Sequence, residues 1–303
     1  MSTSHTFITH SDMGCSASVP KPTLNDILAD LRASGFEQSQ MIVAVDMTRS
    51  NVRRGGGVHR TFPHNSLHTR DAKNPYEAVM ESLCLRLVKL MDDDARVPLL
   101  AFGDAASTRH PAQCTFLGDG NLLDTYHRYI ADPSIDLYGP TSFAGPIQLA
   151  MSQIYESRRF HMLVIVTDGQ ITDDGETLQA IRDAAKLPIQ ILIIGVGDGP
   201  WDEMKHLDDT LELDRDVVQF VEFTPYMHSI DIPGQMDKFA AECLEELPTL
   251  FRNFKRQGKF TDTSERTFPS LPYWSGAVTT TTTSSYPPTT TTTVPYPTAP
   301  MHV

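Results

Sequence analysis

The sequence predicts an α/β fold in which helices flank a doubly wound, mostly parallel sheet. The first observation is a series of short apolar runs, each bounded by polar or glycine-containing segments: 41–47, 97–102, 161–167, 189–196 and 217–223. Strands this uniformly apolar are typical of parallel sheets, which helices cover on both faces. The second observation is helical periodicity around and between these runs, at 24–34, 75–91, 120–130, 147–155, 177–186 and 234–257. Such alternation predicts parallel strands joined by helical crossovers.

Capping residues indicate where the predicted helices begin and end. Thr23 can cap the first helix with its hydroxyl, and Gly35 can end it. The second helix has Asn74 in the capping position and Pro75 at its first helical position, where proline is best tolerated. We expect Pro248 to interrupt the last helical region, because proline lacks the N–H that a helix interior needs.

Composition restricts the class of protein. The hydrophobic fraction of 40% and the charged fraction of 21% fit a soluble globular protein. A net charge of −13 disfavours a nucleic-acid partner, which attracts basic surfaces. No apolar run reaches the roughly 20 residues of a transmembrane segment, and the amino terminus lacks a secretory signal pattern. The cysteines form no Cys-x-x-Cys pair, so we expect reduced thiols in a cytoplasmic protein: Cys15, Cys84, Cys114 and Cys243.

The composition also divides the chain into three segments. Residues 1–22 are polar and are expected to form a disordered tail. Residues 23–258 contain all the predicted strands and helices and are expected to form one domain. Residues 259–303 carry threonine runs and Tyr-Pro units, which cannot form a core, so we expect a second disordered tail.

A possible acylation signal lies in the amino-terminal tail. If translation starts at Met13, Gly14 becomes the residue that N-myristoylation requires, and Cys15 is available for palmitoylation. Two acyl chains give stable anchoring, so this start would predict association with the plasma membrane. If translation starts at Met1, the match is a chance one and no membrane partner is expected.

Oxygen-bearing side chains follow several of the predicted strands. Asp46 lies at the end of the first predicted strand, and Thr48 and Ser50 follow it. Thr141 lies in a loop before a helix, and Asp168 directly follows the 161–167 run. We expect them to converge, because the carboxyl ends of parallel strands meet at one edge of a sheet. Carboxylate and hydroxyl oxygens suit Mg²⁺ or Mn²⁺. The alternative is that the first two residues only cap the following turn.

Other sites are less well supported by the sequence. His59, His64 and His68 share one long loop, but no cysteine or suitably spaced acid completes a zinc site, so we expect solvated histidines. The glycines of 195–199 lack dinucleotide-binding spacing. A phosphohydrolase with an aspartyl nucleophile would need a second acid where Thr48 stands. No phosphate-binding loop or nucleophile elbow occurs, and we therefore expect no enzyme.

The strand-end residues resemble a known metal site. Asp46-x-Thr48-x-Ser50, Thr141 and Asp168 are similar to the metal-ion-dependent adhesion site of von Willebrand factor A domains, with Thr48 in place of the usual serine. Further motifs are similar to the copine subgroup and its plant ubiquitin-ligase relatives: Ser66-Leu67-His68, Asn74-Pro75-Tyr76, Leu137-Tyr138-Gly139-Pro140-Thr141 and Thr167-Asp168-Gly169. In such a site the metal binds an acidic side chain of a partner protein.

The resemblance implies an intracellular, divalent-metal-dependent protein-binding module without catalysis. An adaptor or subunit in ubiquitin ligation is the alternative, because the plant relatives carry a RING. No cysteine follows Cys243, so RING activity is not carried over. The segment before the first strand is too short for the calcium- and phospholipid-binding modules of copines, and calcium-driven membrane docking is not carried over either.

Overall fold

The computed structural model describes residues 21–260, except 54, 56, 92–95, 111–112, 170, 174 and 210–215. Gly14 and Cys15 lie outside the described residues, as do nearly all of the two predicted disordered tails. In the described part of the chain, no helix is both long enough and apolar enough to cross a membrane.

The described residues form a six-stranded sheet with the order β3-β2-β1-β4-β5-β6. The strands are β1 (Gln40–Asp46), β2 (Leu99–Phe102), β3 (Thr115–Gly118), β4 (His161–Thr167), β5 (Ile189–Gly195) and β6 (Val218–Glu222). All neighbouring pairs are parallel except β2 and β3. The predicted fold class is therefore confirmed. The chain leaves β1 towards one edge and returns to β4 on its other side, so the topological switch point lies between β1 and β4.

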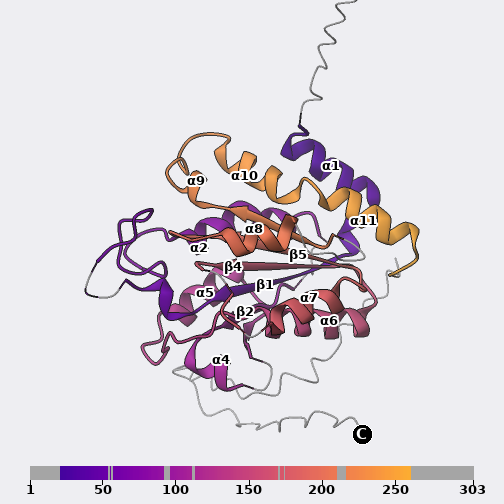
Figure 1. The fold of residues 1–303 in the computed structure, drawn as a ribbon. Coiled ribbons are helices and arrows are strands. Elements are labelled where there is room, and N and C mark those ends of the chain that lie inside the picture. The colour runs from indigo at the N-terminus through magenta and orange to yellow at the C-terminus, as the bar shows by residue number, and fades with distance from the viewer. Residues whose placement is uncertain are drawn as a thin grey trace, which may run out of the picture.

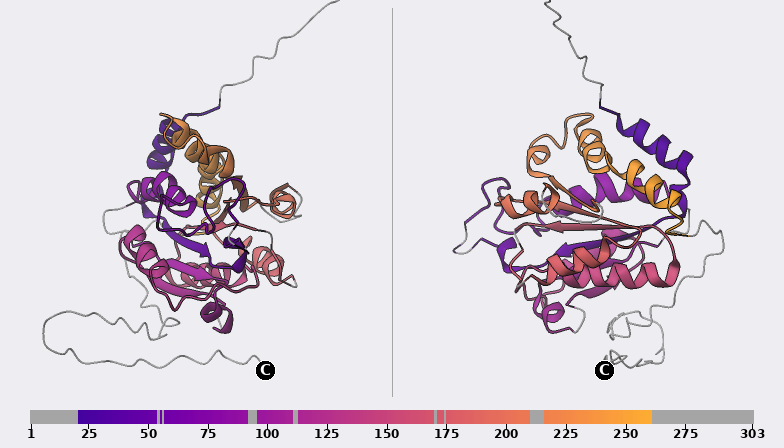
Figure 2. Two further views of the ribbon diagram at one scale, coloured as in Figure 1. Left: turned by 90° about the vertical axis from the view of Figure 1, so that its left-hand side faces the viewer. Right: turned by 45° about the vertical axis from the view of Figure 1, so that its right-hand side comes forward.

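Helices cover both faces of the sheet. Figures 1 and 2 show α1, α2, α10 and α11 over one face and α6 and α7 over the other. The helices are α1 (Leu24–Ser34), α2 (Pro75–Val79), α3 (Leu85–Val88), α4 (Ala105–Arg109), α5 (Leu122–Ile130), α6 (Ala144–Ser157), α7 (Glu176–Ala184), α8 (Asp202–Asp209), α9 (Thr224–Met227), α10 (Gln235–Leu244) and α11 (Leu247–Arg256). This cover explains why β4 and β5 are buried at every position.

Local signals placed the helix ends correctly. Thr23 and Asn74 each cap a helix by accepting a backbone N–H bond, and each forms a full capping box. The helix that begins at Pro75 continues through a π-helical turn, η4 (Met80–Cys84), into α3. Pro248 lies in the first turn of α11, so the predicted interruption separates two helices. The sequence did not predict β3, α4, α8 or α9.

Candidate functional site

Asp46 lies at the carboxyl end of β1 and joins that strand to β4. Its side chain is fully buried. One carboxylate oxygen, Oδ1, accepts the backbone N–H of Thr48 at 2.7 Å, and Oδ2 accepts the hydroxyl of Thr167 at 2.6 Å. Because Thr167 is the last residue of β4, this carboxylate spans the switch point of the sheet. The alternative that Asp46 caps the following turn is thus correct for Oδ1. Its other oxygen, Oδ2, instead bonds the neighbouring strand β4.

A chain of hydrogen bonds connects Asp46 to Asp168. After the turn that Asp46 caps, the hydroxyls of Thr48 and Ser50 lie 2.8 Å apart. Ser50 donates its proton to Asp168 Oδ1 at 2.7 Å, so Thr48 is the donor in the first of these bonds. Thr48 makes no side-chain capping bond to the short helix η2 (Arg49–Asn51), which argues against a capping role for it. Four of the five predicted site residues are therefore brought together.

Thr141 is buried in the loop before α6, beside the first site loop. Its backbone N–H donates to the Thr172 hydroxyl at 2.9 Å, and its carbonyl accepts the Thr172 N–H at 2.9 Å. The same loop pairs with the first one through a bridge between Thr48 and Tyr138. Within the described contacts, no hydrogen bond joins the Thr141 hydroxyl to the other four residues. Its share in a common coordination sphere stays a prediction.

The two carboxylates of the site lie in an unfavourable environment for negative charge. Burial raises the pKa of Asp46 above its ordinary value. Burial, together with the charge of Asp46, raises the pKa of Asp168 well above its ordinary value. No three His, Cys, Asp or Glu side chains of the described chain converge as a metal cluster. A cation here would thus rely on two carboxylates and hydroxyls, a donor set that fits Mg²⁺ or Mn²⁺.

The prediction of solvated loop histidines was wrong for two of the three. His59 is 3% exposed and His68 is 7% exposed. Leu67 in the same loop is fully buried, and it packs close to Gly197 after β5, where a Cβ atom would lie 2.7 Å from its Cδ1. Among the described residues, these histidines belong to no metal-binding cluster, and Nε2 of His59 lies 3.2 Å from the Asn51 carbonyl.

His68 supports the first site loop, a role that sequence analysis missed. Its Nε2 lies 2.9 Å from the Asp46 carbonyl, and its Nδ1 lies 2.7 Å from the Tyr126 hydroxyl. Burial lowers the pKa of His68 to about 4, so the ring is neutral. Because a carbonyl only accepts, Nε2–H donates to Asp46 and Nδ1 accepts from Tyr126. The motif Ser66-Leu67-His68 was the available signal.

Asn51 closes the same loop from the other side. Its Nδ2 donates to the carbonyls of Asp46 and Thr48, each at 3.2 Å. Its Oδ1 accepts the Tyr76 hydroxyl at 2.8 Å, and the Tyr76 ring stacks on His68 with centroids 4.2 Å apart. Helix α2 therefore holds the loop through one hydrogen bond and one ring contact.

Gly103 allows the loop after β2 to approach the site closely. Its φ is +81°, and a Cβ atom there would lie 2.3 Å from Thr48 Cγ2. Any side chain would both strain the backbone and displace Thr48. The glycine at this strand end is thus required by the position of a site residue.

Comparison with known proteins identifies the family. The copine family model matches residues 66–263, well over half of the chain. The chain belongs to the copine family, and the resemblance inferred from the motifs is confirmed.

Two relatives from other organisms are longer than the region that this chain matches. It is 34% identical over 252 residues to E3 ubiquitin-protein ligase RGLG5 from Arabidopsis thaliana, a match that covers 76% of this chain and 57% of the ligase. It is 33% identical to Copine family protein 2 from Caenorhabditis elegans, covering 78% of this chain and 3% of that protein. The chain thus spans little more than half of the ligase and a small part of the nematode protein.

Solved structures are similar at a greater distance. The manganese-loaded Plasmodium vivax TRAP protein matches with a TM-score of 0.42 and 13% identity, covering 67% of this chain and 74% of that chain. The von Willebrand factor type A protein from Catenulispora acidiphila matches with a TM-score of 0.40 and 13% identity, covering 68% of this chain and 43% of that chain. Similarities this distant do not bear on function.

Proposed function

We propose that this protein is a divalent-metal-dependent protein-binding module that captures an acidic side chain of a partner. The observation that carries the proposal is the hydrogen-bonded connection from Asp46 through Thr48 and Ser50 to Asp168 at the switch point of the sheet. Ligands of open α/β sheets bind at this place. The residues that would hold the metal are Asp46, Thr48, Ser50, Thr141 and Asp168.

The protein's contribution is a fixed set of oxygen atoms. Hydrogen bonds from Thr48 and Thr167 fix the orientation of the Asp46 carboxylate at the switch point of the sheet. Ser50 is exposed, and its hydroxyl connects the Thr48 hydroxyl to the Asp168 carboxylate. A bound Mg²⁺ or Mn²⁺ would supply an open coordination position for a carboxylate oxygen of the partner. Burial raises the pKa of both aspartates, and the charge of Asp46 raises that of Asp168 further, so a bound cation would relieve the unfavourable negative charge of the pair.

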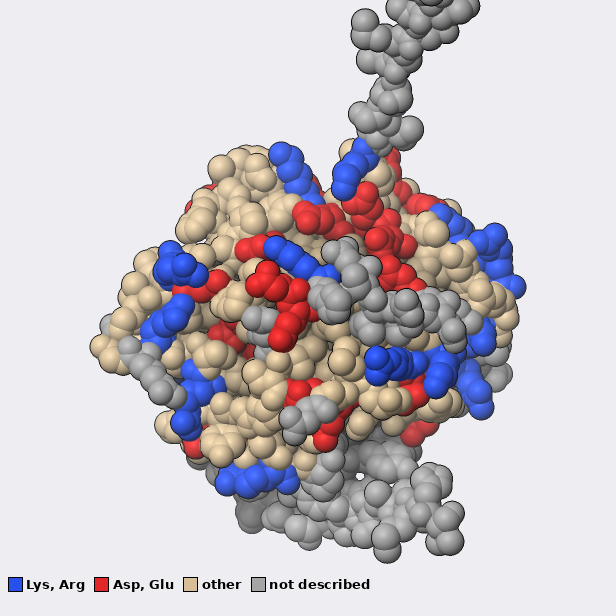
Figure 3. All heavy atoms as spheres, viewed as in Figure 1, with Lys and Arg blue, Asp and Glu red and all other residues tan. Residues whose placement is uncertain are grey.

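The same geometry favours binding over catalysis. His68, the buried histidine beside Asp46, has both ring nitrogens engaged and is neutral, so it does not serve as a general base. Thr48 supplies a hydroxyl where an aspartyl phosphatase needs its second acid. Figure 3 shows acidic and basic side chains interspersed on one face of the described molecule, without a continuous basic patch there, which supports a protein partner over a nucleic acid.

Thermal unfolding with and without metal tests the proposal. Mg²⁺ should raise the melting temperature of the wild type, and EDTA should reverse the shift. Asp46→Asn should remove the shift, because the amide keeps the shape but loses the charge. Asp119→Asn is the matched control, since this acid follows the antiparallel strand β3 and lies where the parallel strands begin, away from the site. A wild type that melts identically in Mg²⁺ and EDTA would contradict the proposal.

A role as an adaptor or subunit in ubiquitin ligation is the second candidate. The 34% identity to RGLG5 favours it. Purification of the tagged chain from cells, with assay of the eluate for ubiquitin transfer, tests this role; absence of transfer activity in the eluate would count against it. We place the protein in the cytoplasm, at the plasma membrane if Gly14 and Cys15 are acylated, which mass spectrometry of the native amino terminus tests.

A further inference from the structure

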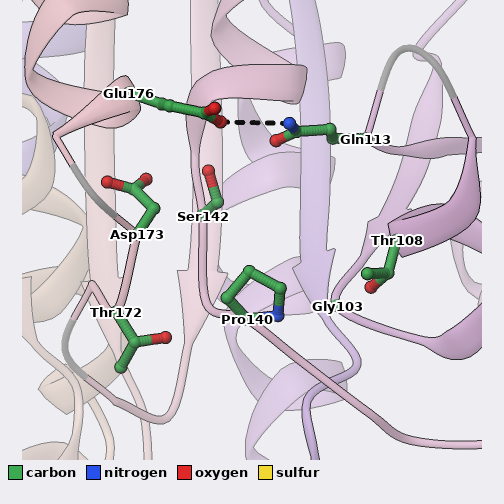
Figure 4. A pocket seen from close by; sticks show the side chains of 8 residues that line it. All are labelled: Gly103, Thr108, Gln113, Pro140, Ser142, Thr172, Asp173 and Glu176. Atoms are coloured by element: carbon green, nitrogen blue, oxygen red, sulfur yellow. Dashed lines mark hydrogen bonds between the residues drawn. The ribbon is translucent and has the colours of Figure 1, made fainter.

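A polar cavity of about 240 Å³ lies beside the candidate metal site (Figure 4). Pro140 and Ser142, the neighbours of Thr141, both line it. Gly103, which approaches Thr48 closely, lines it as well. The cavity and the site therefore share a wall, and a partner bound at the site lies next to the cavity.

Negative charge and hydrogen-bond acceptors dominate this cavity. Asp173 and Glu176 contribute carboxylates from the segment that enters α7, and no Lys, Arg or His is among the described lining residues. Both oxygens of Asp173 already accept backbone N–H groups, from Gly175 and Thr177. Glu176 is different, because Oε2 accepts from Gln113 at 3.0 Å while Oε1 has no partner among the described residues.

The donors that line the cavity are mostly used. The side-chain amide of Gln113 donates to Glu176, which leaves its Oε1 as an acceptor (Figure 4). The Thr108 hydroxyl donates to the Gly139 carbonyl at 2.9 Å. Ser142 is 5% exposed, and its hydroxyl points into the cavity. That hydroxyl accepts one long bond, 3.4 Å from the Ala144 N–H, and donates none within the described part of the chain.

We propose that this cavity binds a Lys or Arg side chain of the same partner that supplies the acidic residue. The inference rests on the proposed function of the neighbouring metal site. A cationic side chain brings several N–H donors and no acceptor, which matches the oxygens of Glu176, Gln113 and Ser142. The partner thus carries a basic and an acidic residue close together, and the pair fixes the direction in which it binds.

Selection of peptides tests the pairing directly. A phage-displayed library of random heptapeptides is bound to the immobilised full chain in Mg²⁺ and eluted with EDTA. The wild type should enrich sequences with Asp or Glu and, at a constant spacing, Lys or Arg. Glu176→Gln should keep the acidic enrichment and lose the basic one. Glu37→Gln, in the short helix before β1 at the opposite edge, is the matched control and should select like the wild type.

A selected peptide then gives the coupling between the two side chains. Replacing its basic residue by norleucine should weaken binding to the wild type about tenfold in fluorescence polarisation, and binding to Glu176→Gln less than about twofold. In Ser142→Ala, the norleucine substitution should likewise weaken binding less than it does in the wild type. Acidic enrichment without a basic partner, or basic enrichment unchanged in Glu176→Gln, would overturn the inference and leave the metal site standing. No EDTA-eluted sequences would overturn both.

Discussion

Asp198 and the pair formed by Asp46 and Asp168 all lie near the carboxyl ends of parallel strands, but the side chains that surround them differ. Asp198 follows β5 and accepts hydrogen bonds from the Arg60 N–H at 3.0 Å and from the Thr61 N–H and hydroxyl at 2.9 and 2.7 Å. It also forms an ion pair with Arg53. Burial alone would raise the pKa of Asp198, but these donors hold it well below its usual range.

Asp46 and Asp168 show the opposite pattern. Their pKa values are raised, because burial is not matched by cationic donors from the protein. Asp198 has its hydrogen-bond donors and its cation within this chain, and these contacts hold the loop of residues 53–61 against the segment after β5. In the proposed function, a bound cation would supply the positive charge that the pair at the switch point lacks. The supply of donors from the protein thus distinguishes Asp198 from the proposed metal ligands Asp46 and Asp168.

The largest expected effect is the response to metal. At a Mg²⁺ concentration of about 100 times the dissociation constant, the wild type should gain about 3 kcal/mol of unfolding free energy over the EDTA state. Asp168→Asn should gain almost nothing, because its amide cannot balance the cation charge. Urea unfolding in both buffers measures the difference, and an equal gain in Asp168→Asn would remove the distinction between the two groups of carboxylates.

Removing Asp198 should have a smaller effect that is independent of metal. Asp198→Ala leaves the Thr61 N–H and hydroxyl and the Arg60 N–H without their acceptor, which should cost about 2 kcal/mol. Arg53 is half exposed and can turn to water, so its ion pair adds little. The loss should be the same in Mg²⁺ and EDTA by urea unfolding. A loss that is larger in Mg²⁺ than in EDTA would mean that Asp198 also takes part in metal binding.

Acid should destabilise the protein through a histidine far from both groups. His161 is the first residue of the central strand β4, at the end of the strand opposite to the site, and burial lowers its pKa to about 4. The unfolded chain takes up the proton near pH 6.5, so this contribution is complete above that pH and is lost as pH falls towards about 4. At about pH 5.5 the loss should be about 1.4 kcal/mol.

His161→Gln isolates this contribution, since glutamine keeps a polar side chain that does not titrate. Its free energy of unfolding should fall less between about pH 7.5 and pH 5.5 than that of the wild type. The Asp198 contact should survive this range, because a lowered pKa preserves its contribution until pH falls below about 4. Parallel pH curves for the wild type and His161→Gln would show that another group titrates.

Sequence patterns predicted the parts of the molecule that depend on local or strand-level rules. β1 and β4 were evident because both faces are buried, and their order placed Asp46 near Asp168. β3 was missed because its four residues are all half-buried and form no apolar run. The burial of His68 and the donors around Asp198 depend on how the long loop folds back, which is a tertiary contact without a periodic signal. They could not be predicted from one sequence.

The smallest expected effect concerns how the first site loop is held. Tyr76→Phe removes the hydroxyl that donates to Asn51 Oδ1 and should cost about 1 kcal/mol in EDTA. Asn51 bonds the carbonyls of Asp46 and Thr48, so a loosened amide should also weaken metal binding, by about twofold to tenfold in a Mg²⁺ titration followed by thermal shift. Tyr226→Phe, on α9, is the matched control, because it removes a hydroxyl that donates to Glu242 rather than to a residue of the site. If Tyr76→Phe lowers stability but leaves the Mg²⁺ titration unchanged, helix α2 supports the fold and has no part in positioning the site.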